Sequence, residues 1–284
     1  MLPNVVLLGA PKCGTTAFHD FFDQHPDIFT CKTKENHLFL GNLDGPMGVE
    51  ALGAYSEFFR AGSEKKIRVE SCVWYLYNEQ SGRKIRELIP QAKLLAFIRQ
   101  PVERAYSMHS MNRRLGFEQI ESFAEALAQE PLRAAHGCEQ YLRYIDTGYY
   151  AQQLKRYYSL FPREQIKVVL FEDLKTQGEE ILQELYDFMG LERMELVNTQ
   201  KQINVTKVPK NESLYRYIRN SGAAGQTIKK MLPTSIRNSL ESLFLEQIPK
   251  LNPERRLELT KKYYHDEILE LQELLGRPLN RWLE

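Results

Sequence analysis

The chain has 284 residues, of which 43% are hydrophobic and 26% are charged, a composition typical of a soluble globular protein. Lys and Arg total 38 against 37 for Asp and Glu, and the net charge of +1 argues against a general nucleic-acid-binding protein. Four cysteines, Cys13, Cys31, Cys72 and Cys138, form no Cys-x-x-Cys pair. We therefore expect reduced thiols rather than a zinc site, a redox motif or a disulfide framework.

No apolar run approaches the ~20 residues of a membrane-spanning helix, and the first residues lack the basic and apolar regions of a signal peptide. The sequence thus predicts a cytoplasmic protein with no membrane or nucleic-acid partner, or a soluble catalytic domain cut from a longer chain. It leaves these two alternatives open, together with the oligomeric state.

Short apolar runs alternate with helical patterns along the chain. Residues 5–8 form a continuous β-branched and apolar run that ends at Gly9, as in a strand buried on both faces. A helix follows, since Phe18, Phe21 and Phe22 have helical spacing. Further strands are predicted at 66–73, 93–98 and 166–171, and further helices at 82–89, 102–114, 120–129, 139–160, 177–189 and 252–275. This order predicts an α/β fold, a P-loop-like three-layer α/β/α domain spanning 1–284 with a central parallel sheet. We expect the helix-rich C-terminal part, 211–284, to pack on that sheet.

Residues 9–16, Gly-Ala-Pro-Lys-Cys-Gly-Thr-Thr, lie directly between the first predicted strand and the first predicted helix. A helix N-terminus offers free N–H groups and partial positive charge to a phosphate, and glycines let the backbone curl around it. The glycine spacing matches a nucleoside-triphosphate P-loop, but the lysine precedes the second glycine instead of following it. That position of Lys12 suits a nucleotide with a single 5'-phosphate group. The alternative is an ordinary turn that needs glycine for steric reasons alone.

This segment resembles the 5'-phosphosulfate loop of sulfotransferases that use 3'-phosphoadenosine 5'-phosphosulfate (PAPS), in its Lys-x-Gly-Thr-Thr form. The resemblance implies that the loop residues Lys12, Cys13, Gly14, Thr15 and Thr16 surround the phosphosulfate. It also implies that Lys12 stabilises charge on the leaving phosphate. Cys13 occupies the variable position, and its thiol is a candidate for a lowered pKa beside a lysine and a helix N-terminus.

A second anion site is predicted after the strand at 93–98. Arg99 would lie beside the phosphate loop if the two strands are neighbours, because ligands gather at the carboxyl ends of parallel strands. The pattern Arg-x-Pro-x-x-Arg-Ala-x-Ser resembles the 3'-phosphate segment of the same family, which implies Arg99 and Ser107 as ligands and Arg104 as a structural residue. Gln100 departs from the more usual Asp, Asn or Glu. Taken alone, Arg99 would instead be a strand-end arginine paired with a carboxylate.

The candidate general base is Glu35. Residues 34–39 resemble the Lys-Glu-x-His-Phe-Phe stretch of carbohydrate sulfotransferases of the heparan-sulfate type, with Leu38 in place of the first aromatic. The resemblance implies Glu35 as the base, with His37 orienting it or the acceptor. His109 is the rival base, although a helix-surface histidine is the more ordinary interpretation.

Four further residues have two interpretations each. Trp74 and Tyr75 either stack on a sugar or pack in the core. Lys207 and Lys210, in a segment that resembles the loop closing over the nucleotide, either reach the 3'-phosphate or belong to a solvated loop.

The resemblance extends from about residue 4 to 283. It implies sulfuryl transfer from PAPS to a hydroxyl or amine of a carbohydrate or small metabolite, with 3'-phosphoadenosine 5'-phosphate (PAP) as product and no metal. The late cysteine pair of the Golgi heparan-sulfate enzymes is missing. Arg113 and Arg114 either line a cleft for an anionic acceptor or form a solvated helix end. The alternatives are a P-loop kinase that uses Mg²⁺ and ATP, and a non-catalytic nucleotide-binding module.

Overall fold

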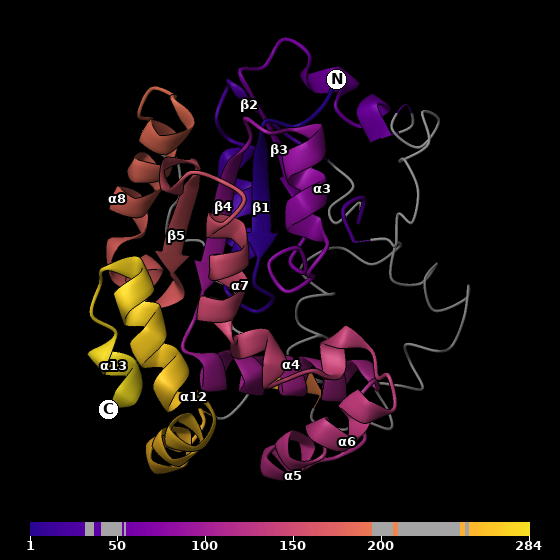
Figure 1. Cartoon of the computed structure of the whole chain (residues 1–284), viewed down its shortest axis with the longest axis vertical. Coiled ribbons are helices and arrows are strands. Elements are labelled where there is room, and N and C mark those ends of the chain that lie inside the picture. The colour runs from indigo at the N-terminus through magenta and orange to yellow at the C-terminus, as the bar shows by residue number, and fades with distance from the viewer. Residues whose placement is uncertain (32–36, 41–52, 54, 195–206, 210–244, 248–249) are drawn as a thin grey trace.

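The structure, a computed structural model, describes residues 1–31, 37–40, 53, 55–194, 207–209, 245–247 and 250–284. At its centre lies a five-stranded parallel sheet with the strand order β2-β3-β1-β4-β5 (Figure 1). The strands are β1 (Val5–Gly9), β2 (Ile28–Thr30), β3 (Ile67–Ser71), β4 (Lys93–Ile98) and β5 (Ile166–Leu170). The predicted parallel sheet is confirmed. The sequence pattern does not reveal β2, since three residues are too few to show a periodicity.

The apolar run at the start of the chain forms the central strand. Val5, Val6, Leu7 and Leu8 are each 0% exposed, because β1 has a strand on both sides and helices on both faces. β1 pairs with β3 on one side and with β4 on the other. The carboxyl ends of β1 and β4 therefore lie next to each other, which is the condition that the predicted second anion site requires.

Helices cover both faces of the sheet. The connection from β1 to β2 runs across the sheet in one direction, whereas those from β3 to β4 and from β4 to β5 run in the other. Right-handed crossovers therefore put α1 (Thr15–Phe22) on one face and α3 (Ser81–Leu88) and α7 (Tyr150–Tyr158) on the opposite face. Figure 1 shows α3 and α7 in front of the strands. Phe18 of α1 packs on Phe97 of β4 with ring centroids 4.5 Å apart.

One long helix, α4 (Pro101–Leu115), crosses below the carboxyl ends of the strands (Figure 1). The Gln100 side chain caps its N-terminus by accepting a hydrogen bond from Glu103 N, Pro101 occupies the first turn, and Gly116 ends the helix in the left-handed conformation. The other helices are α5 (Phe123–Ala128), α6 (Glu130–Ala135), α8 (Phe171–Met189), α12 (Pro253–Leu275) and α13 (Asn280–Leu283). Short 3₁₀ turns span Arg60–Gly62, Gln140–Leu142, Asp146–Gly148 and Arg163–Gln165.

The C-terminal helix α12 has the predicted start and end. Asn252 caps it, and Gly276 follows it in the left-handed conformation. α12 packs against α7 and α4. Two short strands, β6 (Lys207–Pro209) and β7 (Leu245–Gln247), pair antiparallel, and β6 contacts α4. None of the described helices combines the length and apolar character needed to cross a lipid bilayer.

The prediction of one helix over 139–160 is wrong in its first half. The buried carboxylate of Glu130 accepts hydrogen bonds from the backbone N–H groups of Ile145 and Asp146, which are then not used in a helix. α7 begins only at Tyr150. The helix predicted at 177–189 begins earlier than expected, since α8 starts at Phe171 and has a non-helical residue at Gln177.

Candidate active site

The phosphate loop requires glycine at two positions. Gly9 has φ 116°, and a Cβ there would lie 2.1 Å from the carbonyl oxygen of Val73. Gly14 has φ 84°, and a Cβ there would lie 3.0 Å from the ring of Phe171. Both residues therefore serve close backbone approach as well as the left-handed conformation.

The first turn of α1 carries no negative charge of its own. Gly14 is the N-cap residue, no side chain caps the helix, and its first turn contains no acidic residue. Thr15 is buried and Thr16 is exposed at this end. The positive end of the helix dipole is thus directed at the loop with no carboxylate in its own first turn, which suits a phosphate group.

The side chain of Lys12 reaches from this loop to α4. Its Nζ lies 3.5 Å from the Sδ of Met111. Burial, followed by the charges of Arg114 and Arg99, lowers the pKa of Lys12 to about 8. Three cationic side chains are therefore close enough for their charges to oppose one another, and a bound anion would relieve that repulsion.

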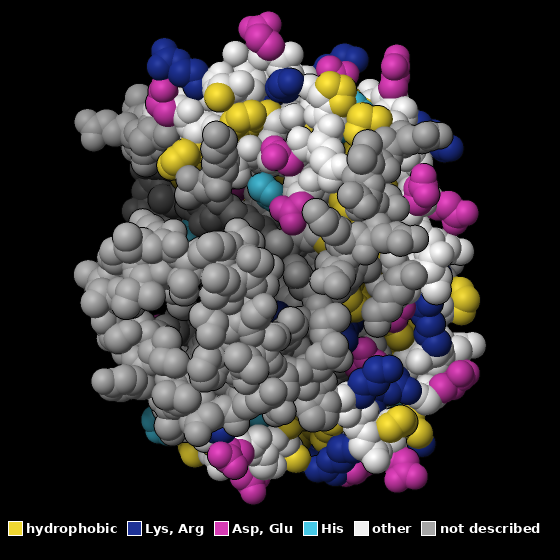
Figure 2. Space-filling model, turned by 180° about the vertical axis from the view of Figure 1, so that it is seen from behind, with side chains coloured by type: hydrophobic (Ala, Val, Ile, Leu, Met, Phe, Trp, Pro, Cys, Tyr) yellow, Lys and Arg dark blue, Asp and Glu magenta, His cyan; other side chains and the backbone are white. Residues whose placement is uncertain are grey.

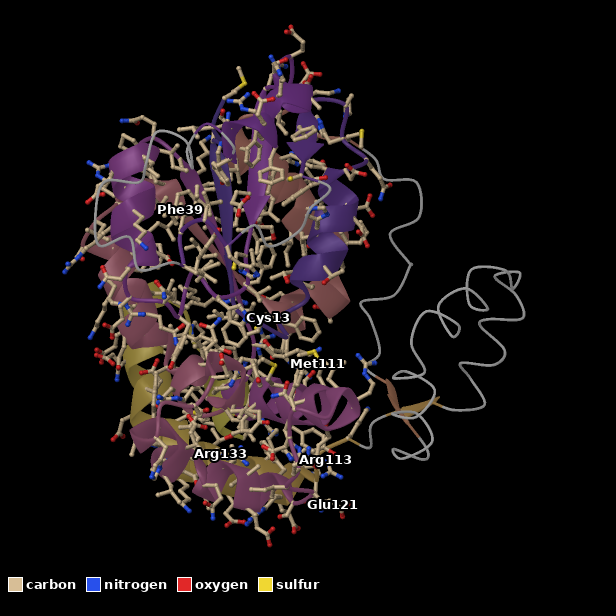
Figure 3. The ribbon with its side chains drawn as sticks, turned by 90° about the vertical axis from the view of Figure 1, so that its right-hand side faces the viewer. Cys13, Phe39, Met111, Arg113, Glu121 and Arg133 are labelled. Carbon is tan, nitrogen blue, oxygen red and sulfur yellow. The ribbon has the colours of Figure 1, made fainter. Side chains whose placement is uncertain are left out.

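One face of α4 is directed at the phosphate loop. Glu103, Ser107, Met111 and Arg114 follow one another at intervals of four, four and three residues, which is the spacing of a single helix face. Figure 3 shows Met111 on the side of α4 that faces Cys13, and Arg113 and Glu121 on its far side. The face therefore carries Ser107, predicted from the sequence, together with Met111, which sequence reasoning missed.

Arg99 follows β4 directly, and its side chain contacts Glu103 and Phe171. Its Nη2 lies 2.9 Å from Oε2 of Glu103, and its guanidinium carbon lies 4.7 Å from the centre of the Phe171 ring. The Nε of Arg99 is buried without a hydrogen-bond partner among the described residues. A guanidinium that keeps an unused buried donor fits a site for a phosphate.

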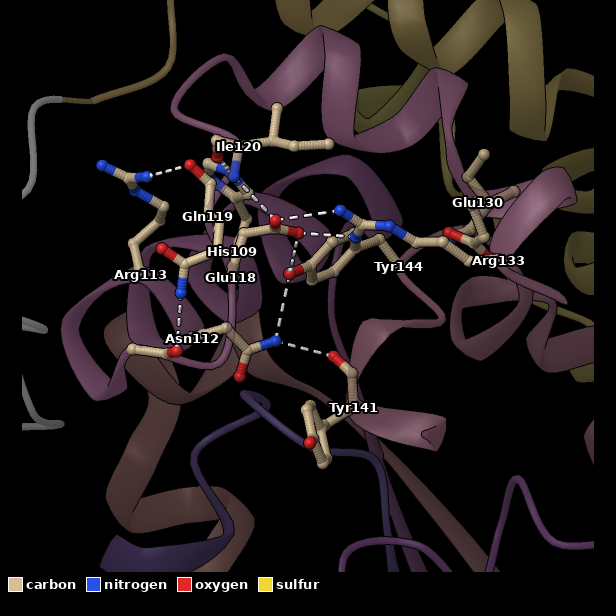
Figure 4. A network of polar contacts seen from close by, with 12 residues as sticks. His109, Asn112, Arg113, Glu118, Gln119, Ile120, Glu130, Arg133, Tyr141 and Tyr144 are labelled. Atoms are coloured by element: carbon tan, nitrogen blue, oxygen red, sulfur yellow. Dashed lines mark hydrogen bonds and ion pairs between the residues drawn. The ribbon is translucent and has the colours of Figure 1, made fainter. Parts of the chain in front are cut away.

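A buried polar network holds the C-terminal half of α4 in place (Figure 4). The carboxylate of Glu118 accepts hydrogen bonds from Arg133 at 2.6 and 2.9 Å, from Tyr144 Oη at 3.1 Å and from Ile120 N at 2.8 Å. Asn112, on α4 itself, donates to Tyr141 O at 2.7 Å and to Tyr144 Oη at 3.1 Å. Since Asn112 follows Met111 directly, this network fixes the helix face that meets Lys12.

The lowered pKa considered for Cys13 is wrong. Its side chain is completely buried, and burial raises the pKa of the thiol to about 12. The loss of hydration therefore outweighs the charges of Arg104 and Arg99, which favour the thiolate.

The structure describes only part of the predicted base region. Glu35 lies outside the described residues. His37 is exposed, has φ 58°, and its Nδ1 lies 3.4 Å from the Sγ of Cys72, directly after β3. Lys207 is the first residue of β6, and Lys210 lies outside the described residues.

Other candidates have structural roles. His109 is not on the helix surface: it is 4% exposed, packs against Phe123 and Tyr144, and its Nε2 lies 2.9 Å from Ile120 O. Because a carbonyl oxygen can only accept a hydrogen bond, the Nε2 of His109 carries the proton in this contact and is poorly suited to act as a general base. Of the two interpretations of Trp74 and Tyr75, packing in the core is correct, since both are buried and Tyr75 donates to Glu70 at 2.8 Å.

The three arginines of α4 lie in different surroundings. Arg113 donates to Gln119 O at 2.6 Å and to Glu121 at 3.1 Å on the far side of the helix, whereas the charge of Arg114 acts on Lys12. Arg104 is completely buried and donates to Tyr144 O, in agreement with its predicted structural role. Gln100, the residue that departs from the family pattern, also donates to Thr260 of α12 at 2.7 Å.

Positive charge is concentrated at the site. Figure 2 shows basic and acidic side chains interspersed over the described part of the back face. Among the described residues, no group of three or more His, Cys, Asp or Glu side chains is arranged to hold a metal ion. The charges of Arg114 and Arg99 both act on Lys12 at the phosphate loop.

Comparison with known families matches residues 2–248 to the sulfotransferase domain. The chain belongs to the sulfotransferase family. This confirms the family that the two anion-site motifs predict.

Two relatives of this sulfotransferase are much longer proteins. The chain is 26% identical over 301 residues to the bifunctional heparan sulfate N-deacetylase/N-sulfotransferase 2 of Bos taurus, covering 99% of this chain and 31% of that protein. It is also 26% identical to the corresponding enzyme 3 of Homo sapiens, covering 67% of this chain and 22% of that protein. The sulfotransferase chain thus spans less than a third of the length of these relatives.

A solved structure has the same fold throughout. The crystal structure of a sulfotransferase from Alicyclobacillus acidocaldarius superposes with a TM-score of 0.75 at 26% sequence identity, and the match covers 100% of both chains. The predicted fold class of this sulfotransferase is therefore confirmed.

Proposed function

We propose that this sulfotransferase transfers a sulfuryl group from PAPS to a hydroxyl or amine of a carbohydrate or small-metabolite acceptor. In this in-line displacement the acceptor forms a new bond to sulfur, the bond between sulfur and the bridging phosphate oxygen breaks, and PAP leaves. The observation that carries the proposal is that the charges of Lys12, Arg99 and Arg114 act on one another at the phosphate loop, next to an α1 N-terminus that no side chain caps.

The phosphate loop would hold the 5' end of the nucleotide. The backbone of Cys13 and Gly14 and the hydroxyls of Thr15 and Thr16 surround the helix N-terminus, which favours the phosphosulfate. Lys12 would keep its proton in the complex, because the added negative charge opposes the burial and the repulsion from Arg114 and Arg99 that lower its pKa. Its ammonium then stabilises the charge that develops on the bridging oxygen.

Arg99 and Ser107 would hold the 3'-phosphate. The unpaired buried Nε of Arg99 supports this role, as does the position of Ser107 on the α4 face that meets Lys12. Lys207 and Lys210 are proposed to add positive charge on the same side, since β6 contacts α4.

Glu35 is proposed to accept the proton of the acceptor hydroxyl or amine as the new bond to sulfur forms. His37 is proposed to orient that carboxylate or the acceptor, because its ring lies against Cys72 at the end of the strand next to β1.

A carbohydrate acceptor is supported by the Lys-Glu-x-His segment and by the relatives, which are named as heparan sulfate enzymes. Heparan sulfate itself is less well supported, because all four cysteines of this chain lie at or before Cys138 and the late cysteine pair of the Golgi enzymes is missing.

The test combines binding with turnover. Wild-type protein is expected to be stabilised against heat by PAP without metal, and to transfer label from PAPS to members of a panel of sugars, lipids and small hydroxyl or amine compounds. The Glu35→Gln variant should lose turnover while keeping PAP affinity, and Glu64→Gln, at an exposed carboxylate, is the matched control. Stabilisation by Mg²⁺ and ATP instead of PAP, or PAP binding without turnover on any acceptor, would contradict the proposal.

A further inference from the structure

A pocket of about 470 Å³ lies between the loop that follows β3 and the start of α7. Its lining residues come from that loop, from the 3₁₀ turns before α7 and from α7 itself. They are Tyr77, Asn78, Glu79, Gln80, Gln140, Asp146, Tyr149, Gln152, Gln153 and Arg156. A pocket of this size is large enough for a small organic ligand.

This pocket is separate from the nucleotide site. Its lining residues precede α3 or belong to α7 and the turns before it, at the same carboxyl edge of the sheet as the phosphate loop. Neither Lys12, Arg99 nor Met111 lines it. Its function must therefore be derived from its own side chains.

The lining is rich in amides and carries little net charge. Five of the ten lining side chains are Asn or Gln, and two are Tyr. Glu79 and Asp146 against Arg156 give a formal charge of −2 + 1 = −1. Part of the hydrogen-bonding capacity of the Arg156 guanidinium is already used, because it donates to Leu76 O at 3.2 Å and to Tyr77 O at 2.9 Å.

Several of these amides have unused hydrogen-bonding capacity. Within the described part of the chain, the side chains of Gln80, Gln140 and Gln152 have no hydrogen-bond partner, and all three are at least partly exposed. Gln153 is only 2% exposed, and its Nε2 donates to the carbonyls of Asp146 and Thr147 at 3.2 and 3.3 Å. Its buried Oε1 has no partner among the described residues, although a buried acceptor is normally satisfied.

We propose that this pocket binds a neutral sugar unit. Each amide both donates and accepts, which matches a hydroxyl group that does the same, and the rings of Tyr77 and Tyr149 offer apolar faces for the C–H groups of a sugar ring. A phosphate or sulfate would need an excess of positive charge, which the lining lacks. An apolar ligand would leave the amides unpaired.

The test measures binding of two neutral disaccharides, cellobiose and N,N'-diacetylchitobiose, by ligand-observed NMR and calorimetry, with and without PAP. The wild-type protein should bind at least one of them, and Gln140→Ala and Gln152→Ala should each weaken that binding about tenfold, because each removes a hydrogen-bonding partner. Gln24→Ala, an exposed amide at the end of α1 on the opposite face, is the matched control and should bind like wild type.

A sulfated heparan tetrasaccharide is the contrasting probe. Any binding of this probe should be the same in wild type, Gln140→Ala and Gln152→Ala, since the pocket carries no net positive charge. The inference is overturned if neither neutral disaccharide binds, if their binding is unchanged in both pocket variants, or if only the sulfated probe depends on Gln140 and Gln152. PAP binding is measured in the same samples, so failure of the nucleotide site is recorded separately.

Discussion

The Nζ of Lys12 lies 3.5 Å from the Sδ of Met111, and this contact joins the phosphate loop to the middle of α4. A thioether is a weak hydrogen-bond acceptor and carries no charge, so it leaves the ammonium without a counter-ion at this position. The charge of Lys12 is thus available to an incoming anion, and burial together with the charges of Arg114 and Arg99 lowers the pKa of the lysine to about 8.

PAP affinity should depend on pH through Lys12. Because the pKa of Lys12 in the free protein is about 8 and an anion favours the protonated form, binding above that pH requires uptake of a proton. Affinity should be nearly constant from pH 7 to 8 and then fall up to about tenfold for each further pH unit. Calorimetry at several pH values, in buffers of different ionisation enthalpy, measures both the affinity and the proton uptake.

The control is Lys12→Arg, whose guanidinium stays protonated over this range. It should remove the proton uptake between pH 8 and 9.5, whatever its affinity at pH 7. The same uptake in this variant would assign the titration to another group.

A negative charge at position 111 should weaken the site. In Met111→Glu the carboxylate would neutralise Lys12, so PAP affinity should fall at least tenfold and the pKa of Lys12 should rise. Met111→Gln has nearly the same size without the charge and is the matched control. If both variants bind PAP equally, the contact has no electrostatic role.

Arg99 should determine the preference for a nucleotide with a 3'-phosphate. Arg99→Ala should reduce PAP affinity by roughly 2 kcal/mol, or about thirtyfold, and leave the affinity for adenosine 5'-phosphate nearly unchanged. Arg60→Ala is the control, because that side chain is 79% exposed and forms only a surface ion pair with Glu57. An equal loss of affinity for both nucleotides would show that Arg99 has a general structural role and does not bind the 3'-phosphate.

Much of the fold and part of the site follow from the sequence because they depend on local patterns. The continuous apolar run at 93–98 gives β4 with its predicted bounds, and Pro101 marks the start of α4. Arg99 comes to lie near Lys12 because β1 and β4 are neighbours, which the strand pattern allows but does not determine.

Other features depend on contacts between distant segments. In the sequence, Met111 is an ordinary residue of a helical pattern, and its contact with Lys12 is known only from the structure. Its spacing of four residues from Ser107 is the signal that sequence reasoning could have used. The turns before α7 could not be predicted for the same reason: they depend on a hydrogen bond from Ile145 N to the carboxylate of Glu130, fifteen residues earlier.

Glu130 should make the stability of the fold depend on pH. Burial raises the pKa of Glu130 to about 7, despite the hydrogen bonds from Asp146 and Ile145. The folded state then binds more protons than the unfolded state between pH 4.5, the ordinary pKa of a glutamate, and about 7. The stabilising contribution of this group is complete below pH 4.5 and is lost as the pH rises through 7.

Urea denaturation at pH 5 and at pH 7.5 measures this effect. The Glu130→Gln variant cannot ionise and keeps one acceptor oxygen for the two backbone N–H groups. Its unfolding free energy should be lower than that of the wild type at both pH values, but the decrease between them should become smaller by up to about 1.4 kcal/mol for each unit of the raised pKa. The decrease should not vanish, because burial also raises the pKa of Glu267 to about 7. Glu125→Gln, at an exposed position of α5, is the control and should retain the wild-type pH dependence. A wild-type pH dependence in Glu130→Gln itself would mean that Glu130 is ionised in the folded protein at neutral pH.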